Sequence, residues 1–321
     1  MQTKILIPIL LFALLLTACS PSPTGLEPVT LPMGYVANVQ FSPFYMAEER
    51  GYFKEAGFDV TFDYRWETDG IRLVAAEEIP FTVASGDQVI QARSQGLPVV
   101  AIAAWYQRFP VAVVALPEYP LDTPEDLRGL TIGIPETFGA SYIGLRALLK
   151  AGGLTENDID LQVIGYTQIA ALTAGTVDAI VVYANNAPAI LEHEGIAFNA
   201  LYTADYASLV SAVLATNETM IKEQPERVRA FTQAFLHGLQ DVLDEPETAF
   251  EICDAYIEGL SENTETQRAV LTHSIELWSA PQLGHFQTES WETAQQTMLD
   301  AGLIEKAVPP DTLFTNTFVQ K

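Results

Sequence analysis

The apolar positions of the chain fall into short, continuous runs that alternate with segments of helical period. Runs rich in Val, Ile and Ala predict strands that are covered on both faces. Because helical segments of ten to fifteen residues separate the runs, the pattern predicts an α/β fold of βαβ units, with mainly parallel sheets flanked by helices. The predicted strands cover residues 29–36, 59–64, 81–84, 99–104, 111–117, 130–135, 161–165, 177–183, 198–202 and 209–216, and the chain is helical from 217 to about 302.

Two of the apolar runs, residues 111–117 and 209–216, divide the chain into parts. The chain has 321 residues, which is more than one compact core usually needs. We therefore interpret the two runs as crossings between two lobes. Lobe 1 is predicted to comprise residues 29–112 and 214–321, and lobe 2 to comprise residues 113–213.

The amino-terminal segment is typical of a lipoprotein signal peptide. Residues 1–18 carry an early lysine, then an apolar run, then small residues. Leu16-Thr-Ala-Cys19 matches the bacterial lipoprotein box, in which the cysteine thiol takes a diacylglyceryl group; an ordinary secreted protein with a chance cysteine is the alternative. Anchoring by two or more acyl chains, such as palmitate, is stable. We expect Cys19 to be lipidated and residues 19–28 to tether a domain on the extracellular or periplasmic side of the cell membrane.

Composition limits the partners. The chain has 41 acidic and 16 basic residues, a formal net charge of −25. A nucleic-acid-binding face needs concentrated Lys and Arg, so nucleic acid is excluded as a partner. We interpret the acidity as a solvated surface. It also argues against a strongly anionic ligand unless arginines gather in the site.

Signatures of metal binding and catalysis are missing. The four histidines (193, 237, 273 and 285) lack HxxxH or HxH spacing, so no metal site is predicted. The sequence contains no GxSxG, GxxxxGK[ST] or HExxH motif. We therefore expect a protein that is not an enzyme and has no cofactor, and any ATPase that drives transport must be another subunit. Cys253 is expected to be a buried apolar residue on a helix.

The candidate binding residues follow the ends of the predicted strands. In open parallel sheets, ligands bind beyond the carboxyl ends of the strands. The residues at these ends are rich in aromatic rings and amides and poor in cations. They are Asn38, Gln40, Phe41, Trp66, Asp69, Ser85, Asp87, Gln88, Trp105, Tyr106, Gln107, Phe138, Tyr142, Tyr166, Tyr183 and Asn185.

This set of side chains fits a planar, neutral or weakly charged heterocycle better than a phosphate or sulfonate. Flat rings stack on a flat ligand, and amides and hydroxyls bind ring heteroatoms. Packing is the alternative role for Trp66, Trp105 and Tyr106, and helix capping is the alternative role for Glu67 and Asp69.

Four segments carry a family resemblance: FSPFYMAEERGYFKEAGFDV at 41–60, DLRGLTIGIP at 126–135, GTVDAIVVY at 175–183 and QPERVRAFTQAF at 224–235. With the strand order, they resemble the periplasmic-binding-protein type 2 family of ABC transporters, in its ThiY-like branch, which binds thiamine pyrimidine precursors. The stretch at 85–115 is similar to the RibY-like riboflavin-binding proteins. The resemblance implies two α/β lobes joined by two crossing segments that close on a ligand.

The resemblance also implies a function. It suggests a monomeric, lipid-anchored substrate-binding protein that captures a small molecule and delivers it to an ABC permease with a separate ATPase. Riboflavin is the expected ligand; a thiamine pyrimidine precursor or, less in keeping with the side chains, an alkanesulfonate or nitrate is the alternative. Trp105 and Tyr106 would then stack on the ring, and Asn38, Gln88 and Asn185 would bind its polar atoms.

Overall fold

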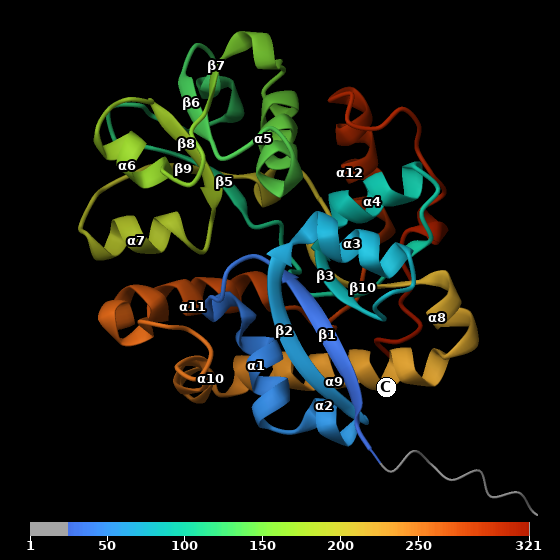
Figure 1. Ribbon diagram of the computed structural model, residues 1–321. Coiled ribbons are helices and arrows are strands. Elements are labelled where there is room, and N and C mark those ends of the chain that lie inside the picture. Colours follow the sequence, from blue (N-terminus) through green and yellow to red (C-terminus); the bar gives the residue numbers. More distant parts are fainter. Residues whose placement is uncertain (1–24, 321) are drawn as a thin grey trace, which may run out of the picture.

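The strands form three sheets in the computed structural model, which describes residues 25–320 (Figure 1). The predicted signal peptide and Cys19 lie outside the described residues. One sheet pairs β1 (Glu27–Gly34) with β2 (Phe58–Trp66), and a second has the order β3 (Thr82–Ser85), β10 (Ala212–Asn217), β4 (Val99–Ala104). The third has the order β7 (Asp160–Val163), β6 (Thr131–Ile134), β8 (Ala179–Tyr183), β5 (Val111–Ala115), β9 (Asn199–Tyr202).

Helices surround these sheets, and a long helical segment closes the chain, as the pattern predicted (Figure 1). Across residues 25–320, no helix combines the length and the apolar character that a membrane span requires. The helices are α1 (Ser42–Glu49), α2 (Tyr52–Glu55), α3 (Glu67–Ala75), α4 (Gly86–Ser94), α5 (Gly139–Ala151), α6 (Gln168–Thr173), α7 (Ala187–His193), α8 (Glu218–Glu223), α9 (Pro225–Asp244), α10 (Pro246–Cys253), α11 (Thr264–Trp278) and α12 (Thr288–Asp300).

Strand β5 has helices on both of its faces. All five of its residues are buried, as the continuous apolar run at 111–117 predicted. Val113 packs into the core that includes α5, whereas Val114 packs into a smaller core with residues of α6 and α7. Figure 1 shows α5 on one side of the five-stranded sheet and α6 and α7 on the other. This is the layered α/β arrangement that the alternating pattern predicted.

The strands run mainly in one direction within each sheet, as predicted, and each of the two larger sheets contains one strand of opposite direction. Strands β1 and β2 are parallel, and β6 is parallel to β7 and β8. Strand β10, however, is antiparallel to β3 and β4, and β5 is antiparallel to β8 and β9. Both exceptions are the strands predicted as crossings. Such a strand enters its sheet from the other half of the molecule, so its direction is not imposed by a preceding βαβ unit.

The predicted lobe boundaries at 112/113 and 213/214 stay predictions. Strand β5 belongs entirely to the five-stranded sheet, and β10 belongs entirely to the three-stranded sheet. We therefore propose to move the boundaries a few residues earlier, to the segments between β4 and β5 and between β9 and β10.

The packing of α1 against α9 supports the segment that leads into the site. Phe44 stacks on Phe235 with ring centroids 4.6 Å apart. At Gly238 the helices approach so closely that an added Cβ would lie 2.2 Å from the carbonyl oxygen of Pro43. Any side chain there would push α1 away and move the short 3-10 helix η1 (Val39–Phe41), which α1 follows directly. Cys253 is buried at the end of α10, as predicted.

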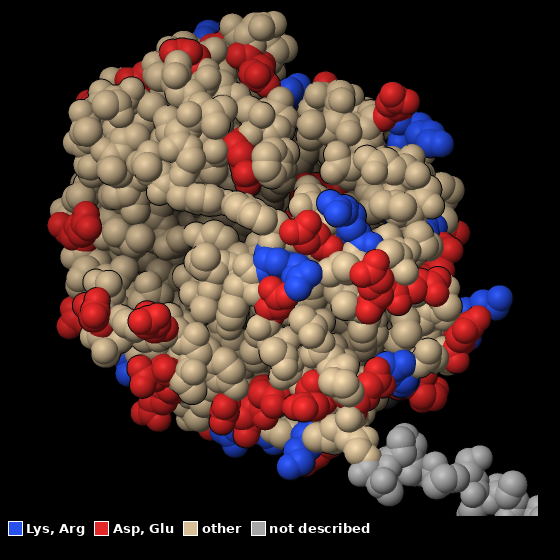
Figure 2. All heavy atoms as spheres, viewed as in Figure 1, with Lys and Arg blue, Asp and Glu red and all other residues tan. Residues whose placement is uncertain are grey.

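Acidic side chains are spread over the face shown in Figure 2 and are densest toward its lower edge, where α1, α2 and α9 lie in Figure 1. Basic side chains are scattered among them and form no continuous patch on this face. Many are paired with carboxylates, such as Arg50 with Glu245 at 2.8 Å and Lys150 with Asp300 at 2.7 Å. The view agrees with a solvated acidic surface.

Candidate functional site

A cavity of about 560 Å³ lies where the strands of both halves end. Residues at or just after the carboxyl ends of β1, β2, β3 and β4 line it, together with residues that follow β6, β7 and β8. This is where the rule for parallel strands predicts a ligand, and the volume lies within the range of about 300–1,000 Å³ usual for small-molecule sites. The predicted residues on its wall are Gln40, Phe41, Trp66, Ser85, Gln88, Trp105, Tyr106, Phe138, Tyr166 and Tyr183.

The inner wall of the cavity, which we define as Gln40, Trp105 and Tyr106, is held by a chain of buried hydrogen bonds. Tyr106 donates its hydroxyl hydrogen to Gln40 Oε1 at 3.0 Å, and Asn185 Nδ2 donates to the Tyr106 oxygen at 3.2 Å. The same nitrogen of Asn185 donates to Ser274 Oγ at 2.6 Å. Burial raises the pKa of Tyr106, so the phenol stays neutral. The chain links η1, the ends of β4 and β8, and α11.

Trp105 reaches the cavity from within an aromatic cluster. It is 4% exposed, and its ring centroid lies 5.4 Å from that of Phe41, 5.3 Å from Phe44 and 6.0 Å from Trp278. Its indole Nε1 has no hydrogen-bond partner among residues 25–320. The ring is therefore largely occupied by packing. That Trp105 also stacks on a ligand stays a prediction.

The mouth of the cavity carries four aromatic rings, which we call the aromatic rim: Tyr35, Trp66, Phe138 and Tyr166. Trp66 is 60% exposed, Phe138 52% and Tyr166 57%. Tyr35 follows β1 and Tyr166 follows β7, yet their ring centroids lie 6.0 Å apart. Large apolar side chains that are exposed to solvent and clustered around a cavity indicate a binding surface, because a bound ligand can shield them from water.

One end of the cavity is acidic. Glu67 opens α3, and its Oε2 accepts hydrogen bonds from Ser85 Oγ at 2.7 Å and Ser85 N at 3.2 Å. Burial, and secondarily the nearby charges of Asp87 and Glu136, raise the pKa of Glu67 to about 7. Its side chain lies against Gly34, where φ is +80° and an added Cβ would lie 2.6 Å from Glu67 Cγ. We call Glu67, Asp87 and Glu136 the carboxylate end.

Three predicted residues lie behind the wall and support it. Asn38 caps η1, since its Oδ1 accepts from the backbone nitrogen of Gln40 at 3.1 Å. Asn185 is fully buried in the hydrogen-bond chain described above. Asp87 is buried in the first turn of α4 and accepts from Gln88 Nε2 at 3.2 Å. These three residues would therefore affect ligand binding indirectly, by positioning the residues that line the cavity.

The structure does not bring three other predicted residues to the cavity wall. Asp69 forms an ion pair with Arg72 at 3.8 Å within α3. Tyr142 is buried on α5 and donates to Glu156 at 2.7 Å. The backbone nitrogen of Gln107 donates to the end of α11 at 2.9 Å. Each follows a predicted strand end closely, but the chain has already turned away from the cavity at these positions.

The sequence reasoning did not select several residues that line the cavity. Tyr35 was assigned to a strand predicted to continue to residue 36, but β1 ends at Gly34. Helix capping was the alternative role considered for Glu67, and the structure places this residue on the cavity wall. Glu136 follows β6, so the rule of strand ends could have included it.

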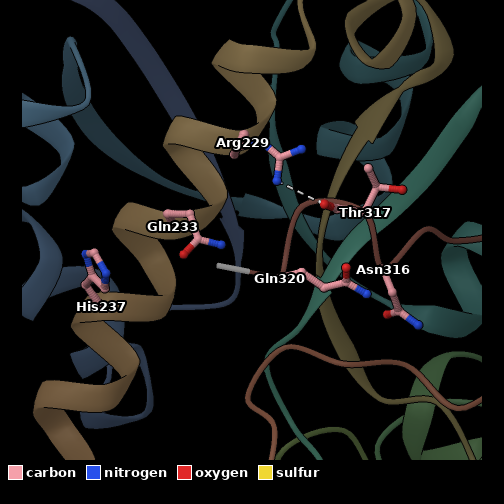
Figure 3. A pocket seen from close by; sticks show the side chains of 6 residues that line it. All are labelled: Arg229, Gln233, His237, Asn316, Thr317 and Gln320. Atoms are coloured by element: carbon pink, nitrogen blue, oxygen red, sulfur yellow. Dashed lines mark hydrogen bonds between the residues drawn. The ribbon is translucent and has the colours of Figure 1, made fainter.

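A second hollow, of about 790 Å³, lies between α9 and the carboxyl-terminal segment (Figure 3). Arg229 Nη1 donates to the carbonyl oxygen of Thr317 at 3.0 Å, and Gln233 Nε2 donates to that of Phe318 at 2.7 Å. These bonds hold the terminal segment on α9, so the polar side chains there serve the fold.

Within residues 25–320, no group of three or more His, Cys, Asp or Glu side chains could hold a metal ion.

Comparison with known proteins agrees with this geometry. The family profile described as NMT1/THI5 like matches residues 38–249. The chain is 38% identical to the riboflavin-binding protein RibY of Chloroflexus aurantiacus, over 99% of this chain and 98% of that protein. It is 30% identical to a formylaminopyrimidine-binding protein of Halalkalibacterium halodurans, over 91% and 92%. The crystal structure of the periplasmic aliphatic sulphonate binding protein SsuA from Escherichia coli superposes with a TM-score of 0.71 at 14% identity, over 91% and 92%.

Proposed function

Since the chain belongs to the NMT1/THI5-like family, we propose that it is the substrate-binding protein of an ABC importer and that its ligand is riboflavin. The observation that carries the proposal is the cavity itself. It combines an aromatic rim, an inner wall of amide and phenol groups, and a wall on which residues 25–320 place no Lys, Arg or His. The full-length similarity to a riboflavin-binding protein supports the same choice.

The chemistry of riboflavin matches these parts. Its isoalloxazine ring is large, flat and uncharged, so it can cover the exposed rings of Trp66 and Phe138. The Nε2 group of Gln40 has no partner among the described residues and can donate to a ring carbonyl. The ribityl hydroxyls can donate to carboxylate oxygens such as those of Glu67.

A thiamine pyrimidine precursor is the second candidate. The 30% identical relative carries the name of a formylaminopyrimidine-binding protein. An aminopyrimidine also carries N–H groups, which could donate hydrogen bonds to the carboxylates of Glu67 and Glu136. An alkanesulfonate or nitrate fits the site less well, because such anions require cationic or strong dipolar partners.

The remaining parts of the proposal concern location and partners. We infer lipidation at Cys19, which holds the protein on the outer side of the cell membrane. We also infer delivery of the ligand to a permease with a separate ATPase, action as a monomer, and no catalysis and no resident cofactor. Mass spectrometry of the protein isolated from membranes tests the first point, because a diacylglyceryl cysteine at the mature amino terminus has a distinct mass.

Titration of riboflavin with the purified domain tests the ligand. Stacking on aromatic side chains is expected to quench flavin fluorescence to saturation at a one-to-one ratio. The comparison ligand is an aminopyrimidine. Its binding is measured by calorimetry, because it does not fluoresce in the same range as a flavin. Tight aminopyrimidine binding without any flavin quenching would assign the protein to the second candidate.

A further inference from the structure

At the carboxylate end of the cavity, residues 25–320 place no Lys, Arg or His on the wall that could neutralise the carboxylates. Glu67 and Glu136 line the cavity, and Asp87 lies behind Ser85 and Gln88. The basic residues that flank Glu67 in the sequence have other partners: Arg65 pairs with Asp63, and Arg72 with Asp69. The negative potential of the three carboxyl groups is therefore directed into the cavity.

The surrounding groups respond to this potential. Burial, with the charges of Glu136 and Glu67 as further causes, raises the pKa of Tyr166 to about 12. Tyr183 has its pKa raised by burial and, to a lesser extent, by Glu67 and Asp87. A second anion placed here would meet the same desolvation and the same repulsion.

Polar groups that line the cavity at the carboxylate end still have open hydrogen-bonding capacity. Gln88 is 8% exposed and lines the cavity, and its Oε1 accepts no hydrogen bond from the described residues. Glu67 Oε1 likewise has no donor among residues 25–320. Acceptors that face the cavity without a protein partner can accept hydrogen bonds from a ligand, so this end is suited to a ligand that supplies hydroxyl or N–H donors.

We propose that Glu67 and Glu136, backed by Asp87, make the cavity selective for an uncharged ligand that carries hydroxyl donors and exclude the phosphate ester of the same ligand. The inference rests on the proposed function: riboflavin binds, whereas riboflavin 5′-phosphate is rejected because its phosphate would lie against the carboxylates. Flavin in the phosphorylated form would first require hydrolysis by a phosphatase, which transfers the phosphoryl group to water and leaves the free alcohol.

Parallel titrations with the two flavins test the selectivity, since both fluoresce and both carry the same ring. We expect riboflavin 5′-phosphate to bind on the order of a hundredfold more weakly than riboflavin. The titrations are made at pH 8, where Glu67, with its pKa of about 7, is mostly ionised. In the double variant E67Q/E136Q the difference should shrink by about tenfold, because two of the three charges are removed. The single variant E136Q should shrink it less and retains the bond between Glu67 and Ser85.

The control is E251Q/E258Q, which makes the same change in net charge at two exposed positions on and after α10. It should leave the ratio of the two affinities unchanged. Equal affinity of wild type for the two flavins, or a ratio unaltered in both E136Q and E67Q/E136Q, would overturn the selectivity while leaving riboflavin as the ligand. Failure of both flavins to bind would instead overturn the proposed function.

Discussion

The inner wall and the aromatic rim border the same cavity, but they are built in opposite ways. Trp105 and Tyr106 of the inner wall are each 4% exposed, and their rings are held in place by packing and by hydrogen bonds of the Tyr106 hydroxyl. Trp66 and Phe138 of the rim are more than half exposed. The inner wall is therefore preorganised by the fold, whereas the rim gains its partner only when a ligand arrives. The two regions should respond differently to the same kind of mutation.

The largest effect is expected from truncation of the inner wall. Trp105→Ala should lower the free energy of unfolding by about 3–5 kcal/mol, because it opens a cavity in the cluster around Phe41, Phe44 and Trp278. Denaturant unfolding with a comparison of m-values measures this. A loss below about 1 kcal/mol would mean that Trp105 belongs functionally with the rim.

Loss of a single hydrogen-bonding atom should have a smaller effect. Tyr106→Phe removes the hydroxyl that joins Gln40 to Asn185. The buried side-chain amides of Gln40 and Asn185 each lose one hydrogen bond. We expect a loss of about 1–3 kcal/mol in the free energy of unfolding. The companion variant Ser274→Ala removes the far end of the same chain. Additive losses in the double mutant would show that the chain does not act as a unit.

Truncation of the rim should leave the fold intact and weaken binding. Trp66→Ala should change the free energy of unfolding by no more than about 0.5 kcal/mol but reduce riboflavin affinity on the order of tenfold. Tyr206→Ala is the matched control, because Tyr206 is also an exposed aromatic residue but does not line the cavity. Equal affinity of the two variants would remove the rim from the binding site.

The remaining prediction concerns pH rather than the removal of a side chain. The pKa of Glu67 is raised from its ordinary value of 4.5 to about 7 in the folded protein. The folded state therefore holds this proton more tightly, and the stabilisation is present below about pH 4.5 and is lost as the pH rises to about 7. Wild type should lose stability relative to E67Q across that window. Unfolding free energies measured for both proteins from pH 4 to pH 8 provide the difference, and a flat difference would contradict the assignment.

The strand-end rule found much of the site because it depends on local pattern. A buried apolar run shows where a strand lies, and the residue after it then reaches the edge of the sheet. Trp66, Ser85 and Trp105 were identified in this way. The rule failed for Asp69 and Tyr142, which lie inside helices that had already turned away. It also placed Tyr35 in a strand, because alternation alone does not define a strand end to within one residue.

The sequence by itself determined the α/β class, the strands and most helices, and the poverty of cations in the candidate site, because these depend on periodicity and composition. Only the tertiary structure decided that β5 and β10 run against their neighbours. It alone decided that Glu67 faces Ser85 and that Tyr35 meets Tyr166. Such contacts join residues that are far apart in the chain, and no local pattern encodes which distant side chain will lie opposite.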